Sequence, residues 1–181
     1  MTAGAASEKN ETSRDAAEAP RLVGLSTAPL VVAPIRIGLV GLLGMVGATL
    51  RGLSWSVAAA EFVLGTSVFA FAALADPRRH FFRLKDEAEP VPADATFEPI
   101  GRVALLATYP STVGLAALTG VSLAFNAALA AVLASGAAGL GVAGAITGAQ
   151  IAMRERVGGV RLYVERGGRR LFSAETTRER A

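Results

Sequence analysis

The chain has 181 residues, of which 52% are hydrophobic and only 18% are charged, with a formal net charge of +3. It contains no cysteine and one histidine, His80, which excludes disulfides, thiolate metal sites, cysteine nucleophiles and histidine-rich metal clusters. A soluble domain has about 25% charged residues, so the basic excess of this chain is better explained by flanks facing lipid headgroups than by nucleic-acid binding.

The first part of the chain is too polar to form a core. Residues 1–20 are small, polar and mixed in charge, so we expect residues 1–28 to be a disordered N-terminus on the cytoplasmic side. The segment 22–35 is apolar, but Pro29 and Pro34 interrupt it and it is too short to cross a membrane. We interpret it as a lead-in at the membrane interface.

Two apolar stretches separated by a tight turn predict a first transmembrane hairpin over residues 29–75. The expected helices cover about 34–50 and 55–75. Pro34 suits the first turn of a helix, where its missing N–H costs nothing. The second helix ends before Asp76 and Pro77, which are strong stop signals.

Arg36 is the one basic residue near the start of this hairpin. Our first interpretation lets its side chain extend to the lipid headgroups. The alternative is a span that starts near Leu22 and buries Arg36 in the membrane, at a cost of at least ~2.5 kcal/mol. Both interpretations remain open on the sequence alone.

Residues 103–153 contain no charged side chain, which is about twice the ~20 residues that one membrane crossing needs. This stretch therefore predicts a second transmembrane hairpin, with helices at about 103–124 and 132–153 and a turn near Asn126. Pro110 lies inside the first of these helices and should kink it.

The last predicted helix carries a repeated pattern of small residues. Gly141, Gly144 and Gly148 lie among alanines at spacings that allow helices to approach closely. We expect these glycines to pack against another helix of the same chain. Self-association into a homo-oligomer through this face is the alternative.

The tail, residues 154–181, is basic and polar. Residues 160–165 alternate like a strand, and Gly167 with Gly168 is a two-residue turn signal. The tail therefore has the pattern of a possible β-hairpin. A lone hairpin is marginal in water, and anionic lipid headgroups or a partner protein could order it.

The distribution of basic residues predicts the orientation. The loop 76–102 has five Arg or Lys, the tail has eight and the N-terminal flank has four, whereas the turn after the first helix has only Arg51. By the positive-inside rule all three basic segments are cytoplasmic. We therefore expect an all-α, multi-pass protein of the bacterial inner (plasma) membrane, with four helices arranged as two hairpins and both termini inside the cell.

Glu61 is the one ionisable residue deep within a predicted span. A carboxylate there is costly unless it is protonated, paired or hydrated. Gly65, Val68 and Ala72 share its helical face, so we expect Glu61 to point toward the bundle. It would be either a site that responds to protons or cations, or a structural residue bonded to hydroxyls of a neighbouring helix, with Arg51 as a possible partner.

The sequence lacks the motifs of catalysis. It has no phosphate-binding loop, no zinc motif and no pair of carboxylates close together within a span. We therefore expect no enzyme activity, no metal and no cofactor. The favoured function is a scaffold or accessory subunit that contacts another membrane protein, and the alternative is a small transporter or channel component that uses Glu61.

Overall fold

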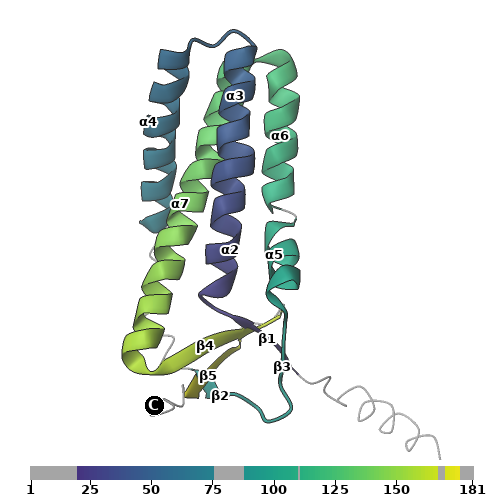
Figure 1. Cartoon of the computed structure of the whole chain (residues 1–181), viewed down its shortest axis with the longest axis vertical. Coiled ribbons are helices and arrows are strands. Elements are labelled where there is room, and N and C mark those ends of the chain that lie inside the picture. The colour runs from purple at the N-terminus through teal and green to yellow at the C-terminus, as the bar shows by residue number, and fades with distance from the viewer. Residues whose placement is uncertain (1–19, 76–87, 110, 167–169, 176–181) are drawn as a thin grey trace, which may run out of the picture.

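In the computed structural model, which describes residues 20–75, 88–109, 111–166 and 170–175, an upright bundle of helices stands on a small β-sheet (Figure 1). The chain is thus mostly helical, but the expectation of an all-α fold is wrong because five short strands form a sheet. The helical segments in chain order are α2 (Thr27–Ile35), η1 (Arg36–Leu42), α3 (Leu43–Leu50), α4 (Trp55–Leu74), α5 (Ile100–Thr108), α6 (Ser111–Phe125) and α7 (Ala127–Gly158).

The first three segments form one continuous helix from Thr27 to Leu50. The predicted start at residue 34 is therefore wrong, and the apolar lead-in is the first part of the helix. Pro29 lies in the first turn, where a missing N–H has no partner to lose. Pro34 lies deeper in the helix, where its missing N–H removes one backbone hydrogen bond. The helix nevertheless continues through the wider π-helical turns of η1.

The second long helix, α4, follows a tight turn in which Gly52 has φ of 99°. This left-handed conformation favours glycine, because it has no Cβ. The helix ends at Leu74, one residue before the predicted end. Together, the first two helices form an antiparallel hairpin, as Figure 1 shows.

The predicted third helix is broken into α5 and α6, which are bent by 48° relative to each other. Tyr109 ends α5 with φ of −94° and ψ of 135°, the extended conformation expected for a residue that precedes proline. The predicted kink is thus a complete break in the helix, and α5 starts at Ile100, three residues before the expected boundary.

The last helix, α7, is longer than predicted at both ends. It begins after Asn126, whose side-chain Oδ1 accepts the N–H of Leu129 at 3.1 Å, and it ends before Gly159, which has φ of 63°. Both are standard helix caps. The 32 residues between them span roughly 48 Å, so the lower part of α7 extends to the sheet.

The core of the bundle forms around α7, which packs against the helix Thr27–Leu50, α4 and α6. In the apolar 18-residue stretch of α7 about 56% of the residues are buried, whereas in that of α4 only 11% are buried. Small side chains make this contact possible. The buried cluster at the upper end consists of Met45, Ala48, Ala58, Ala131 and Ala134.

The sheet has the strand order β2-β5-β4-β1-β3 and lies at the lower end of the bundle (Figure 1). Its antiparallel centre is β5, β4 and β1, and the short edge strands β3 and β2 pair in parallel with β1 and β5. The strands are β1 (Arg21–Gly24), β2 (Glu89–Pro90), β3 (Thr96–Phe97), β4 (Val160–Glu165) and β5 (Leu171–Glu175).

The sheet is built from the three polar segments of the chain. β1 precedes the first helix, β2 and β3 lie between α4 and α5, and β4 and β5 follow α7. The N-terminal segment up to residue 28 is therefore ordered from residue 20 onward, contrary to expectation, because β1 pairs with β4. Residues 1–19 lie outside the described part. The tail has the antiparallel strand pair that its alternation indicates, with β1 and β2 as further partners.

Three of the described helices, Thr27–Leu50, Trp55–Leu74 and Ala127–Gly158, are long and apolar enough to cross a membrane. The bent pair α5 and α6 makes a fourth if it is counted as one span. Many large apolar side chains of these helices point outward, which is compatible with a membrane protein. On α4 they include Val63 (63% exposed), Leu64 (66%), Val68 (64%) and Phe71 (75%).

We predict that Gly139→Ala destabilises the bundle by about 1–3 kcal/mol, because overpacking of a close helix contact has this cost. A Cβ at Gly139 would lie 2.7 Å from both Phe69 Cβ and the Thr66 carbonyl oxygen of α4. The measurement is the unfolding midpoint of the purified protein in detergent. The matched control is Gly114→Ala on α6, where a Cβ meets nothing within 4 Å. A Gly139→Ala protein as stable as this control would contradict the assigned packing of α4 on α7.

Candidate functional site

Arg36 lies inside the bundle, at the junction of α2 and η1, and its side chain is half-buried. Its Nε donates to the Thr112 hydroxyl at 2.9 Å and its Nη2 donates to the Ser111 hydroxyl at 2.8 Å. Both acceptors are at the start of α6, beside the break before that helix. The first interpretation, in which the Arg36 side chain extends to lipid headgroups, does not agree with these two hydrogen bonds to α6. The alternative, a span that starts near Leu22, is closer to the structure in one respect, because the helix begins at Thr27, nine residues before Arg36.

Arg51 makes the corresponding contact at the other end of α6. Its Nε and Nη2 donate to the carbonyl oxygens of Leu123 and Ala124, at 3.0 and 2.9 Å. The last carbonyls of a helix lack intrahelical partners and carry partial negative charge, so a cation stabilises them. Arg36 in the first long helix and Arg51 directly after that helix thus hold α6 at its beginning and at its end.

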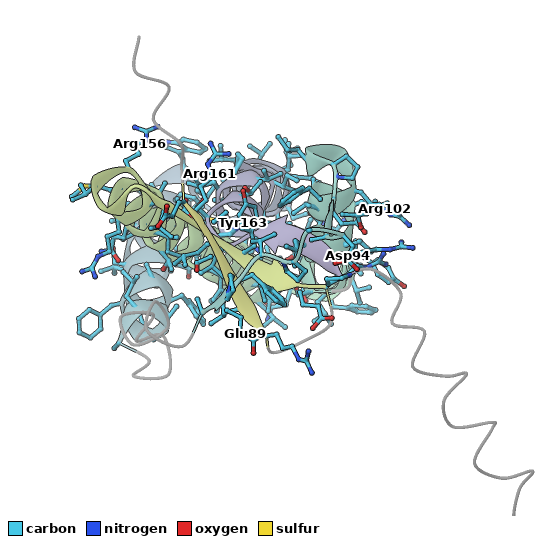
Figure 2. All side chains as sticks on the ribbon, turned by 90° about the horizontal axis from the view of Figure 1, so that it is seen from below. Glu89, Asp94, Arg102, Arg156, Arg161 and Tyr163 are labelled. Carbon is cyan, nitrogen blue, oxygen red and sulfur yellow. The ribbon has the colours of Figure 1, made fainter. Side chains whose placement is uncertain are left out.

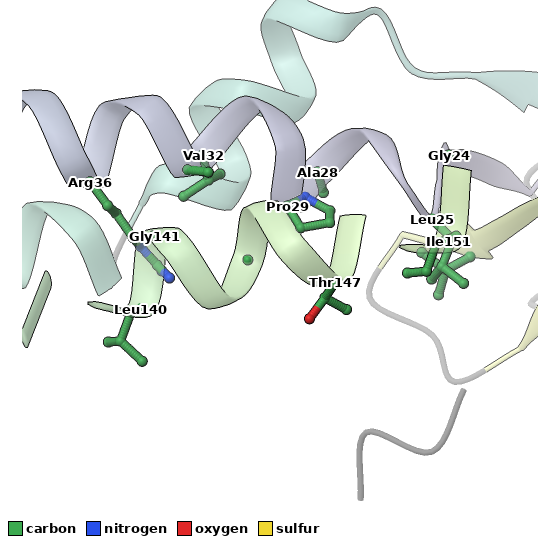
Figure 3. A pocket seen from close by; sticks show the side chains of 13 residues that line it. Gly24, Leu25, Ala28, Pro29, Val32, Arg36, Leu140, Gly141, Thr147 and Ile151 are labelled. Carbon is green, nitrogen blue, oxygen red and sulfur yellow. The ribbon is translucent and has the colours of Figure 1, made fainter. Parts of the chain in front are cut away.

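A cavity of about 450 Å³ lies between α2 and α7, directly beside Arg36 (Figure 3). Its walls are apolar, and at the end near the sheet it is bounded by β1 and β4. Thr147 contributes a hydroxyl that donates to the Ala143 carbonyl oxygen of its own helix. The lining residues are Gly24, Leu25, Ala28, Pro29, Val32, Ala33, Arg36, Leu140, Gly141, Gly144, Thr147, Ile151 and Val164.

The glycines that the sequence singled out on α7 face the first helix. A Cβ at Gly141 would approach Ile37 and Ala33, and one at Gly148 would approach Leu30, all at 3.0 Å or less. Gly144 is less tightly packed, because its nearest neighbour would be the Pro29 carbonyl oxygen at 3.6 Å. Gly141 and Gly148 thus pack closely within the chain, and the space beside Gly144 forms part of the cavity.

Glu61 is half-buried on the face of α4 that contacts α7, between buried Ala58 and Gly65, which packs against Ser135. Among the described residues its Oε2 is buried without a hydrogen-bond partner. Of the residues expected on the same face, Val68 is 64% exposed and points away. Arg51, the possible partner, donates to the α6 carbonyls instead.

At the lower end, Glu98 forms the main charged cluster of the sheet. Its side chain is only 4% exposed and lies within ion-pair distance of Arg166 (3.2 Å), Arg102 (3.6 Å) and Arg21 (3.9 Å). Its Oε1 accepts a hydrogen bond from Arg166, whereas Oε2 is only within ion-pair distance of Arg102. Arg21 is in β1, Arg102 is in α5 and Arg166 follows β4, so one carboxylate links all three polar segments.

A second carboxylate joins the helices to the sheet. Glu155, near the end of α7, accepts the hydroxyl of Ser26 at 2.9 Å and the backbone N–H of Leu162 in β4 at 3.0 Å. Ser26 directly precedes α2. Glu155 therefore fixes the ends of two long helices relative to the central strands.

The lower surface combines aromatic and charged side chains (Figure 2). Tyr163 lies opposite Phe172 in the neighbouring strand and packs against Phe97, with ring centroids 5.0 Å apart. Residues directly opposite in adjacent strands share a face of the sheet. Figure 2 shows Arg156 and Arg161 at one side of this face, and both are exposed.

No family model, curated protein or solved structure matches this chain. Within the part of the chain that the structure describes, no group of His, Asp and Glu is arranged to hold a metal ion. Function must therefore be inferred from the geometry of the bundle, the cavity and the sheet.

The sequence missed two features of this site. Arg36 was expected at the interface, because Pro34 was interpreted as the start of a helix. The signal that could have placed it is the run Pro110-Ser111-Thr112, which puts two hydroxyls at a helix break. Only Arg102, four residues after Glu98, is close to it in the chain, whereas Arg21 and Arg166 are separated from it by 77 and 68 positions, so the cluster could not be found from the sequence.

We predict that Glu98→Gln loosens the sheet, because three arginines would then lose their common counter-charge. The arginines are 38–53% exposed, so solvent screening limits the loss of stability to about 1 kcal/mol. Hydrogen exchange at the amides of β1 and β4 should quicken. The control is Glu89→Gln on the exposed edge strand β2. Equal exchange rates in the two variants would contradict the linking role of Glu98.

Proposed function

We propose that this protein is a four-span integral membrane protein of the bacterial inner membrane, with both termini in the cytoplasm. In this proposal it acts as a non-catalytic scaffold or accessory subunit, and its sheet is the contact surface for a partner. The observation that carries the proposal is the gathering of all three polar segments into one sheet at one end of an apolar bundle.

The physical argument starts from the solvent. α4 is covered mainly by α7, and most of its apolar surface is exposed. Burial of apolar surface is the main driving force of folding in water, so such a helix would be unfavourable there. Lipid removes this cost, since a 20-residue apolar helix matches the ~30 Å hydrocarbon core. Both hairpins then begin and end on the side of the sheet.

The sheet supports a role in contact with a partner more than in chemistry. It lies beneath the bundle with half-buried central strands and exposed edge strands, with Arg156 and Arg161 at its border and Tyr163 on its face. Aromatic and arginine side chains are enriched at protein interfaces. The same arginines would also attract anionic lipid headgroups, so the proposal includes the membrane surface as a second contact.

The topology can be tested with single cysteines, because the natural chain has none. We predict that a membrane-impermeant thiol reagent labels Ser54→Cys and Phe125→Cys in intact cells. Arg161→Cys and Glu89→Cys should be labelled only after lysis. All four side chains are exposed in the structure. A difference in labelling between the four variants would therefore report the side of the membrane and not burial within the fold. Labelling of Arg161→Cys from outside would overturn the proposed orientation.

The partner role is best tested with surface variants, because β4 lies within the sheet and removal of the tail would destroy the sheet itself. We predict that Arg156→Glu with Arg161→Glu lowers recovery of co-purifying membrane proteins by at least about tenfold, since like-charge contacts disfavour a complementary surface. Glu89→Gln serves as the control. If the variant is correctly inserted and recovery of co-purifying proteins is unchanged, this surface is not the contact site for a partner.

A transporter or channel function remains the second candidate, because Glu61 has a buried carboxylate oxygen without a hydrogen-bond partner among the described residues. If Glu61 serves transport, Glu61→Gln should abolish pH-dependent ion flux in proteoliposomes at unchanged expression. In the scaffold proposal, Glu61→Gln leaves flux at background and recovery of partners intact.

A further inference from the structure

The ion-pair cluster around Glu98, at the base of α5, carries more positive than negative charge. Three arginines lie within ion-pair distance of this one carboxylate, so three positive charges and one negative charge leave a net charge of +2. The Glu98 side chain is only 4% exposed, whereas Arg102 is 53% and Arg166 is 38% exposed. The negative charge is therefore buried, and the positive charges remain accessible.

Two of these guanidinium groups use few of their hydrogen-bond donors within the described part of the chain. Arg102 Nε lies 3.6 Å from Glu98 Oε2, and this oxygen accepts no hydrogen bond from a described residue. Arg166 donates from Nη1 to Glu98 Oε1 at 3.2 Å. Each guanidinium has five N–H groups in a planar fork, so both side chains have donors left for a ligand. We assign no ligand contact to Arg21, which has other interactions.

The exposed face of α5 continues from this cluster into apolar surface. Residues at the spacing i, i+3, i+4 and i+7 lie on one side of a helix. From the sheet end upward, this face of α5 consists of Arg102, Leu105, Leu106 and Tyr109, and all four are exposed. Val103, in contrast, is buried, and α5 packs against α2. A cation at the sheet end is thus followed directly by an accessible apolar strip.

We propose that this face of α5 binds an anionic phospholipid, whose phosphate pairs with Arg102 and Arg166 and whose acyl chain lies along Leu105 and Leu106. Guanidinium groups bind phosphate oxygens through charge-assisted, often paired hydrogen bonds. An arginine near the end of a spanning helix extends to the headgroup layer. The net positive charge favours an anionic lipid over a zwitterionic one. An acidic segment of a partner protein would match the charge but would leave the apolar strip uncovered.

This lipid site rests on the proposed membrane insertion, because lipid reaches α5 only in an inserted bundle. It goes beyond a general attraction of arginines for headgroups, since it assigns positions to one phosphate and one chain. Insertion is tested separately by a carbonate wash, after which the protein should stay in the membrane pellet. Recovery in the supernatant would overturn the membrane proposal together with the site. A pelleted protein that lacks the binding described below would overturn the site alone.

The experiment adds phosphatidylglycerol to the full-length protein in a nonionic detergent and follows the unfolding midpoint, which a bound ligand raises. Phosphatidylglycerol should raise it more than phosphatidylcholine, which has no net charge, and more than glycerol phosphate, which has no acyl chain. Arg102→Gln should weaken binding about fivefold, the effect of one arginine near anionic lipid. Arg161→Gln is the matched control, because it removes the same charge from an exposed position on β4 outside the cluster.

A second measurement locates the acyl chain and does not depend on stability. Phosphatidylglycerol with a photoreactive acyl chain should crosslink to α5 at or beside Leu105 and Leu106. Arg102→Gln should lower this yield, whereas Arg102→Lys, which keeps the charge, and Arg161→Gln should retain it. Equal loss of binding in Arg102→Gln and Arg161→Gln would indicate diffuse attraction and would overturn the proposal. Equal binding of phosphatidylcholine or glycerol phosphate, or crosslinks confined to other helices, would overturn it as well.

Discussion

The close approach of α7 to its neighbours is the contact on which the remaining structure depends. Gly139 packs against α4, and Gly141 and Gly148 pack against the first helix. These contacts leave no room for larger side chains, so dispersion forces act between backbones at short range. In lipid there is no hydrophobic drive between helices, so this shape match is what would hold the bundle together. The long exposed face of α4 follows from it, because α4 is attached mainly through α7.

The length of α7 connects this packing to the sheet. Since α7 continues to Gly158, it carries β4 away from the bundle core, and Glu155 fixes that end to Ser26 and Leu162. β4 then pairs with β1 on one side and with β5 on the other. A tail hairpin that would be marginal alone becomes the centre of a five-stranded sheet. The ends of all helical hairpins are thereby held in one layer.

The sequence predicted the features that depend on local composition and missed those that depend on distant contacts. The apolar stretches, a kink near Pro110 and a turn near Asn126 follow from local rules, and the structure has the apolar stretches, a break between α5 and α6 in place of the kink, and a turn at which Asn126 caps α7. The two-residue strands β2 and β3 have no periodicity to detect. The predicted helix start at Pro34 was wrong because the helix continues past this proline through the wide turns of η1, which have no pattern in the sequence.

The same distinction applies to charges inside the bundle. An isolated arginine among apolar helices is costly, and the fold places both Arg36 and Arg51 at ends of α6, where hydroxyls or unpaired carbonyls are present. The break before α6 thus does more than bend a helix, because it creates a polar position within an apolar bundle. Arg36, which bonds to the hydroxyls at this position, also lines the cavity. A helix break, an oriented cation and an apolar space therefore occur together, although each is explained by different residues of the chain.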